Sequence, residues 1–113
     1  MQQNQYDKEP LTAVEAQRLA QEIAFGPIVF QVSRLMLKFG IVQLLADERK
    51  GMTQEEISKA CGLPSYGAQV LLEASLTIGT VLLREGRYCL AKAGWFLPVS
   101  YTHLRAHETS LHL

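Results

Sequence analysis

The stretch from Gly51 to Gly79 reads GMTQEEISKACGLPSYGAQVLLEASLTIG and decides the fold. Thr53 and Glu56 stand three residues apart, just before an apolar position. This is the spacing of a capping box, so a short helix is predicted to begin here. Gly62 suits the left-handed residue that commonly ends a helix. The sequence therefore predicts a short helix closed at both ends by local chemistry.

A longer helix is predicted after the turn at Leu63-Pro64. Ser65 is expected to cap this helix at its start. Its inward-facing positions are predicted to be Leu71, Leu72, Ser75 and Leu76. A short helix, a tight glycine-containing turn and a longer helix together make a helix-turn-helix.

Two short strands are predicted directly after this motif, at Val81–Arg84 and Arg87–Leu90. Glu85-Gly86 lies between them, and the glycine supplies the positive φ that a tight hairpin turn requires. Such a hairpin is the wing of a winged helix. A last short helix is expected over Ala91–Phe96, with its two aromatic residues as apolar anchors.

Three helices are predicted upstream of the motif. Thr12 and Glu15 form a capping box at the start of the first. Gly26-Pro27 is expected to end it, because proline suits the first turn of a following helix. That second helix, residues 27–39, is apolar on more than one side, unlike a helix with a single buried face. A short third helix is expected within residues 41–50.

Two interpretations of the second helix stay open. It is either a central helix wrapped by its own domain or a helix that also packs against a second subunit. A domain this small has few elements with which to cover it. The expected fold class is mainly α, a winged helix-turn-helix with three N-terminal helices and a small β-hairpin wing. The expected divisions are a polar lead-in at residues 1–10, the winged-helix domain at 11–97 and a tail at 98–113.

Composition excludes several classes of function. Eleven Lys and Arg balance eleven Asp and Glu among 113 residues, so no overall field attracts nucleic acid or anionic lipid. The stretch Phe25–Ala46 is interrupted by glycine, proline and charged residues, and it does not predict a membrane span. Cys61 and Cys89 lack the spacing of metal ligands and are predicted to be free thiols. With no signal peptide at the N-terminus, we expect a soluble, cytoplasmic chain.

The predicted helix-turn-helix lacks the charges that DNA recognition uses. No Lys or Arg lies between Ser65 and Gly79, and Glu73 would face the phosphates. The wing offers Arg84 and Arg87, whereas backbone binding usually takes several phosphate contacts. We therefore expect no nucleic-acid partner, and a small winged-helix DNA-binding transcriptional regulator is the alternative function. The sequence also holds no glycine-rich nucleotide loop and no nucleophile–base constellation, so no catalytic, cofactor-binding or metal-ligating residues are predicted in this chain.

Three marks carry a resemblance to a known family. FGPIVFQVSRLMLKFGIVQLLAD spans residues 25–47, with Phe-Gly-Ile at the entry to the third helix. The Thr53–Glu56 cap precedes GLPSYGAQVLLEA at residues 62–74, and the wing runs into KAGWF at residues 92–96. Over about Glu9 to Leu97, the chain resembles the N-terminal domain of bacterial SAM-dependent methyltransferases of the O-methyltransferase type.

The resemblance implies a homodimer in which the N-terminal helices interleave with those of the partner. It implies S-adenosylmethionine as the cofactor of the parent protein, held by a Rossmann-like domain outside this chain. It also implies methyl transfer to a hydroxyl of a small-molecule acceptor by that parent. The interface role carries over to the apolar residues of the second helix, which are Ile28, Val29, Phe30, Val32, Leu35, Met36 and Phe39.

The tail carries His103 and His107 four residues apart, a spacing that places both on one face of a helix. Glu108 follows the second histidine, so the zincin order is absent, and two ligands are too few for a closed zinc site. VSYTHLRAHET at residues 99–109 matches one reading frame of a transposase adapter used in preparing DNA sequencing libraries. We therefore expect residues 98–113 to be a non-native, adapter-derived tail.

Overall fold

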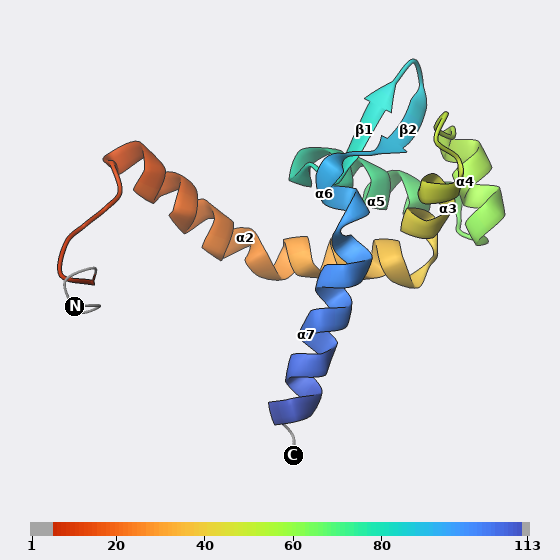
Figure 1. Cartoon of the computed structure of the whole chain (residues 1–113). Coiled ribbons are helices and arrows are strands. Elements are labelled where there is room, and N and C mark those ends of the chain that lie inside the picture. Colours follow the sequence, from red (N-terminus) through yellow and green to blue (C-terminus); the bar gives the residue numbers. More distant parts are fainter. Residues whose placement is uncertain (1–5, 112–113) are drawn as a thin grey trace.

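The computed structural model describes residues 6–111, with side chains described as far as residue 106. Figure 1 shows a small body from which one long helix extends to one side and another helix extends downward. The elements in chain order are α2 (Ala13–Lys38), α3 (Ile41–Asp47), α4 (Gln54–Cys61), α5 (Ser65–Ile78), β1 (Val81–Arg84), β2 (Arg87–Leu90), α6 (Lys92–Trp95) and α7 (Leu97–Leu111).

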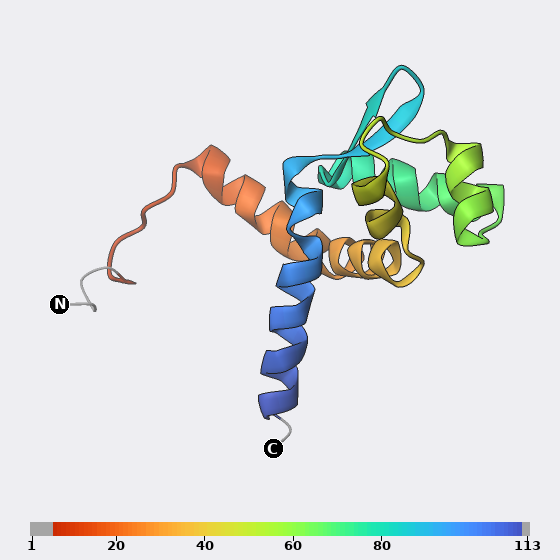
Figure 2. The same ribbon diagram turned by 45° about the vertical axis from the view of Figure 1, so that its right-hand side comes forward.

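The core is formed by residues of the second half of α2, of α3, α4 and α5 and of the hairpin (Figures 1 and 2). Helix, turn, helix and wing follow one another as predicted, so the expected winged helix-turn-helix is confirmed. The three inward positions Leu71, Leu72 and Ser75 are buried, and Leu76 packs against the core. The buried apolar residues are Met36, Ile41, Val42, Leu45, Ile57, Ala68, Leu71, Leu72, Val81, Tyr88 and Leu90.

The predicted start and end of α4 are both confirmed. The Glu56 amide donates to Thr53 Oγ1 at 3.2 Å, and the Thr53 amide donates to the Glu56 carboxylate at 2.9 Å. Gly62 ends the helix in the left-handed region, with φ of 66°. The predicted Ser65 cap is wrong, because Pro64 occupies the N-cap position of α5 without a side-chain bond. The Ser65 hydroxyl instead accepts a hydrogen bond from Gln54 Nε2 at 3.1 Å.

The wing forms over the residues predicted for it. Val81 pairs with Leu90 and Arg84 with Arg87 in an antiparallel register. Glu85 and Gly86 have φ of 51° and 76°, so both central residues of the turn are left-handed, as in the two-residue turns that match strand twist. The predicted hairpin is confirmed.

The expected anchors of α6 are wrong. Trp95 and Phe96 are 42% and 68% exposed, and the Arg49 guanidinium lies 5.0 Å from the centre of the Trp95 ring. The buried residue of this helix is Gly94. A Cβ at that position would collide with the Thr80 carbonyl oxygen, so the absence of a side chain is what lets α6 pack.

The predicted break at Gly26-Pro27 is also wrong, because α2 is one helix of 26 residues with Pro27 inside it. Proline removes one backbone hydrogen bond and bends a helix, but it does not always end one. Figure 1 shows α2 changing direction about halfway along. The break at Gly40 is confirmed, since its φ is 82° and α3 begins at the next residue.

Candidate dimer interface

The first half of α2 has an exposed apolar surface. Its start is fixed by the predicted capping box, in which the Glu15 amide donates to Thr12 Oγ1 at 3.2 Å. Beyond this cap the helix extends away from the body of the domain (Figures 1 and 2). We call the exposed large apolar side chains between residues 13 and 28 the arm surface; they are Val14, Leu19, Ile23, Phe25 and Ile28. Exposed apolar groups gathered on one element indicate an interaction surface.

The seven residues predicted for the interface divide into two groups. Ile28, Phe30 and Phe39 are exposed, and Val29 is partly buried. Met36 is 1% exposed and belongs to the core of its own domain, against which the partly buried Val32 and Leu35 also pack. Within residues 27–39, Met36 is thus enclosed by its own domain, whereas packing of Ile28, Phe30 and Phe39 against a second subunit stays a prediction.

An apolar groove lies where the arm leaves the body. It has a volume of about 460 Å³ and is formed between α2, the end of α5 and the beginning of α7. Its lining residues are Glu22, Gly26, Val29, Phe30, Ser33, Ile78, Leu97 and Tyr101. Two residues of the predicted interface, Val29 and Phe30, thus form part of a concave surface next to the arm.

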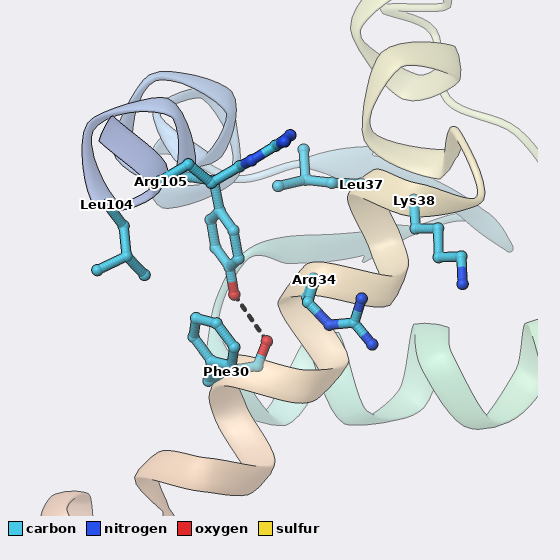
Figure 3. A pocket seen from close by; sticks show the side chains of 7 residues that line it. Phe30, Arg34, Leu37, Lys38, Leu104 and Arg105 are labelled. Atoms are coloured by element: carbon cyan, nitrogen blue, oxygen red, sulfur yellow. Dashed lines mark hydrogen bonds between the residues drawn. The ribbon is translucent and has the colours of Figure 1, made fainter. Parts of the chain in front are cut away.

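Tyr101 of helix α7 contacts the same part of α2. The Tyr101 hydroxyl donates to the Phe30 carbonyl oxygen at 2.6 Å, and the two rings stack with their centres 5.3 Å apart (Figure 3). Burial raises the pKa of the Tyr101 phenol, and the nearby Arg34 partly offsets that rise. The helix runs through residue 98, where the tail was predicted to begin; that boundary stays a prediction.

A second cavity, of about 500 Å³, lies beside this contact, and Figure 3 shows the side chains that line it. Arg34 and Lys38 come from α2 and Arg105 from α7. Arg34 Nε donates to Gln31 Oε1 at 3.1 Å, and Lys38 Nζ lies 6.0 Å from the centre of the Phe39 ring. None of the described residues that line the cavity carries a carboxylate, thiol or imidazole, so these residues form a mixed apolar and cationic surface.

The face of the winged helix that would read DNA carries carboxylates. Gln69 Nε2 on α5 donates to Glu73 Oε1 at 2.9 Å. Burial raises the pKa of Tyr88, and the charges of Glu73 and Glu55 raise it further. Arg87 on the wing donates to the Gly51 carbonyl at 2.9 Å, so this cation is engaged within the domain. The phosphates of a DNA duplex approaching this face would therefore meet carboxylates as well as cations.

The other predicted features lie apart from this surface. Cys61 and Cys89 are free and partly buried, and burial raises the pKa of the Cys61 thiol. His103 is exposed, while the side chains of His107 and Glu108 fall outside the described residues. Within the described part of the chain, no three His, Cys, Asp or Glu side chains could together hold a metal ion. No single helix in that part of the chain is long and apolar enough to span a membrane. Helices α2 and α3 reach that length and composition only together, as a pair bent by 61°.

A family model described as a Dimerisation2-like domain matches residues 17–88. The chain is similar in structure to the SAM-dependent methyltransferase SibL in its apo form, with 24% identity over 73% of this chain and 23% of that one, and a TM-score of 0.60. It is similar to human N-acetylserotonin methyltransferase in complex with SAM, with 21% identity over 75% and 25% of the two chains, and a TM-score of 0.56. The complex of LepI with SAM gives 16% identity over 85% and 24%, with a TM-score of 0.63.

The structural similarity shows that the chain shares its fold with these proteins, and the family model shows which family the chain belongs to. The chain spans only 23% to 25% of the length of these solved proteins. No curated protein sequence matches it significantly. The predicted resemblance to the N-terminal domain of SAM-dependent methyltransferases is thereby confirmed for family and fold.

Proposed function

Because the chain belongs to the Dimerisation2-like domain family, we propose that it forms a homodimer through the arm surface and the adjacent groove. The observation that carries this proposal is the uneven burial of α2. Met36 near its C-terminal end is 1% exposed, whereas Ile23 and Ile28, on either side of Pro27, are 68% and 59% exposed. Apolar side chains that the described part of the chain leaves exposed gain free energy when a second copy removes them from water.

The whole protein is proposed to be a SAM-dependent methyltransferase that transfers a methyl group to a hydroxyl of a small molecule. The shared fold with two methyltransferases supports this class. S-adenosylmethionine would be held by a catalytic domain outside residues 1–113. The part of this chain would be to join two such proteins and to place their catalytic domains. The acceptor hydroxyl rests on the family resemblance alone.

Concentration-dependent sedimentation of the full chain tests the homodimer. We expect the mass to rise from monomer to dimer as the concentration is increased through the micromolar range, a range common for moderate interfaces. A mass that stays monomeric up to millimolar concentration, with the helical signal intact, would refute the proposal.

The same samples test the alternative of a DNA-binding regulator. Titration with a mixed-sequence duplex at low salt should give no binding, because Glu73 lies on the helix that would enter the groove and Arg87 is engaged within the domain. Binding that weakens steeply as salt is added would favour the regulator instead.

A further inference from the structure

We propose that the solvent-facing side of α5, together with the start of α4 and the inner side of the wing, binds a protein segment that carries both cationic and apolar side chains. This role is separate from the proposed homodimer and does not depend on it. Figures 1 and 2 show the hairpin above α5 and α4 beyond one end of α5. We call this surface the α5 face; its residues are Glu55, Tyr66, Val70, Glu73, Leu83 and Tyr88.

Helix α5 turns a mixed apolar and acidic side to solvent. Val70 and Glu73 follow Tyr66 by four and seven residues, so the three side chains share one side of the helix. Tyr66 is 76% exposed and Val70 is 47% exposed, and Glu73 is exposed as well. Ala68 and Leu72, on the other side of the helix, are fully buried. The exposed apolar side chains of α5 are therefore not part of its packing against the core.

The wing adds an apolar residue and a phenol to this surface. Leu83 pairs with Tyr88 across the hairpin, so the two side chains lie on the same side of the wing. Tyr88 is 8% exposed and its hydroxyl makes no hydrogen bond to a described residue, whereas Leu83 is 48% exposed. Burial and the charges of Glu73 and Glu55 raise the pKa of Tyr88. One carboxylate from each of two helices therefore lies near this phenol.

The two carboxylates have no cation of their own. Arg87 is engaged with Glu56 at 3.4 Å and with the Gly51 carbonyl. Neither Glu55 nor Glu73 makes an ion pair with another described residue. Helix α5 contains no Lys or Arg, although hydrogen bonds from Gln54 to Ser65 hold its first turn against that of α4. The α5 face is therefore both apolar and negatively charged.

This combination decides which kind of partner fits. A wholly apolar partner would cover Tyr66, Val70 and Leu83, but it would also take two carboxylates out of water without compensation, at a cost in free energy. An acidic segment or a DNA duplex would bring like charges against them. A segment in which lysine or arginine stands beside apolar side chains covers the apolar residues and supplies the opposite charge. Because the carboxylates are exposed, added salt should weaken this binding.

Fluorescence anisotropy of a labelled peptide tests this binding with the full chain. The probe is a short synthetic peptide of alternating lysine and leucine. Two comparison peptides carry glutamate in place of its lysines or serine in place of its leucines. Glu73→Gln and Val70→Ser alter the α5 face. Glu22→Gln and Ile23→Ser are the matched controls, because they make the same kinds of change at exposed positions on the arm. Circular dichroism checks that each variant is folded.

We expect Glu73→Gln to raise the dissociation constant of the lysine–leucine peptide about threefold. Val70→Ser should raise it about fivefold, because part of the burial of the valine is lost. The two arm variants should bind like the unaltered chain, and both comparison peptides should bind more weakly. In nuclear magnetic resonance spectra, the amide shifts caused by the peptide should concentrate within residues 65–77 and 81–90.

Three results would overturn the proposal. Equal weakening by the arm variants would show that the peptide binds exposed charge and apolar surface wherever they occur. Equally tight binding of the glutamate peptide would remove the role of the two carboxylates. No binding of the lysine–leucine peptide at low salt would leave the α5 face without this partner. None of these results bears on the homodimer, which sedimentation tests separately.

Discussion

The same charge placed at two positions of α2 should have two different effects. Ile28 and Met36 are eight residues apart on one helix, and they are 59% and 1% exposed. An aspartate at position 28 meets water in the monomer, whereas one at position 36 is placed in the core. Ile28→Asp is therefore expected to dissociate the dimer, and Met36→Asp is expected to unfold the domain.

The magnitudes follow from burial. Fully burying an isoleucine side chain contributes about 1.5–3 kcal/mol, and somewhat over half of that remains to be gained at Ile28. With two copies of the residue in a twofold dimer, Ile28→Asp costs about 2–4 kcal/mol of association free energy before any penalty for the carboxylate. This corresponds to at least about a thirtyfold weaker dimer. The monomer loses only about 0.5 kcal/mol from the lower helix propensity of aspartate.

Met36→Asp is expected to lower the folding stability of the monomer itself, and by a larger amount of free energy. Truncation of a buried methionine alone costs about 2–5 kcal/mol, and an unpaired buried charge costs more. Small domains have only about 5–15 kcal/mol of stability in total, so this variant should lose most of its helical signal at 25 °C.

Sedimentation velocity over a concentration series and thermal melting by circular dichroism measure both effects. Gln43→Asp serves as the control, since this polar residue is exposed on α3. A folded Ile28→Asp variant that dimerises as tightly as the control would remove Ile28 from the interface. A folded Met36→Asp variant would refute the placement of Met36 in the core.

Three further outcomes are expected from local features. Gly94→Ala should lower the melting temperature, because its Cβ would collide with the Thr80 carbonyl at a cost of about 1–3 kcal/mol. Gly67→Ala is the control, because a Cβ there would lie 3.8 Å from its nearest neighbour, and it should leave the melting temperature unchanged or raise it. Equal losses of melting temperature in the two variants would contradict the close packing of Gly94 against Thr80. Thr53→Ala should lower the urea-unfolding free energy by about 1 kcal/mol, whereas Thr12→Ala, on the uncovered arm, should leave it unchanged and only speed local amide exchange. A hydrogen bond from the Thr53 amide holds the pKa of Glu56 below its ordinary value of 4.5, so this carboxylate stabilises the domain above that pH and the contribution is lost as the pH falls through the lowered pKa. Glu56→Gln should reduce the fall in melting temperature on acidification. A variant whose melting temperature falls at low pH as much as that of the unaltered chain would contradict this role of Glu56.

Features set by neighbouring residues were predictable from the sequence. The cap at Thr53, the left-handed Gly62 and the turn at Glu85-Gly86 each depend on chemistry within a few positions, and each is found where it was expected. Gly26-Pro27 has the same kind of local signal, but there the continuity of a long helix outweighs the missing hydrogen bond.

Features set by distant contacts were not predictable. Trp95 and Phe96 are apolar, yet the core against which α6 packs is reached by Gly94. The division of the interface candidates into the buried Met36 and the exposed Ile28 depends on where α3 and α5 cover α2, which the apolar pattern of one helix does not reveal. The Tyr101–Phe30 contact joins segments with no shared local signal.

In the proposed dimer, the continuity of α2 through Pro27 would link the core of each subunit to the relative orientation of the two subunits. The turns around Ser33 and Met36 are held in the domain, while the residues before Phe25 extend about 20 Å as a helical lever. A tilt of about 10° at the held end would move the far end by about 3.5 Å over that length. A conservative change beneath Met36 can therefore reorient one subunit against the other without altering any residue that they share.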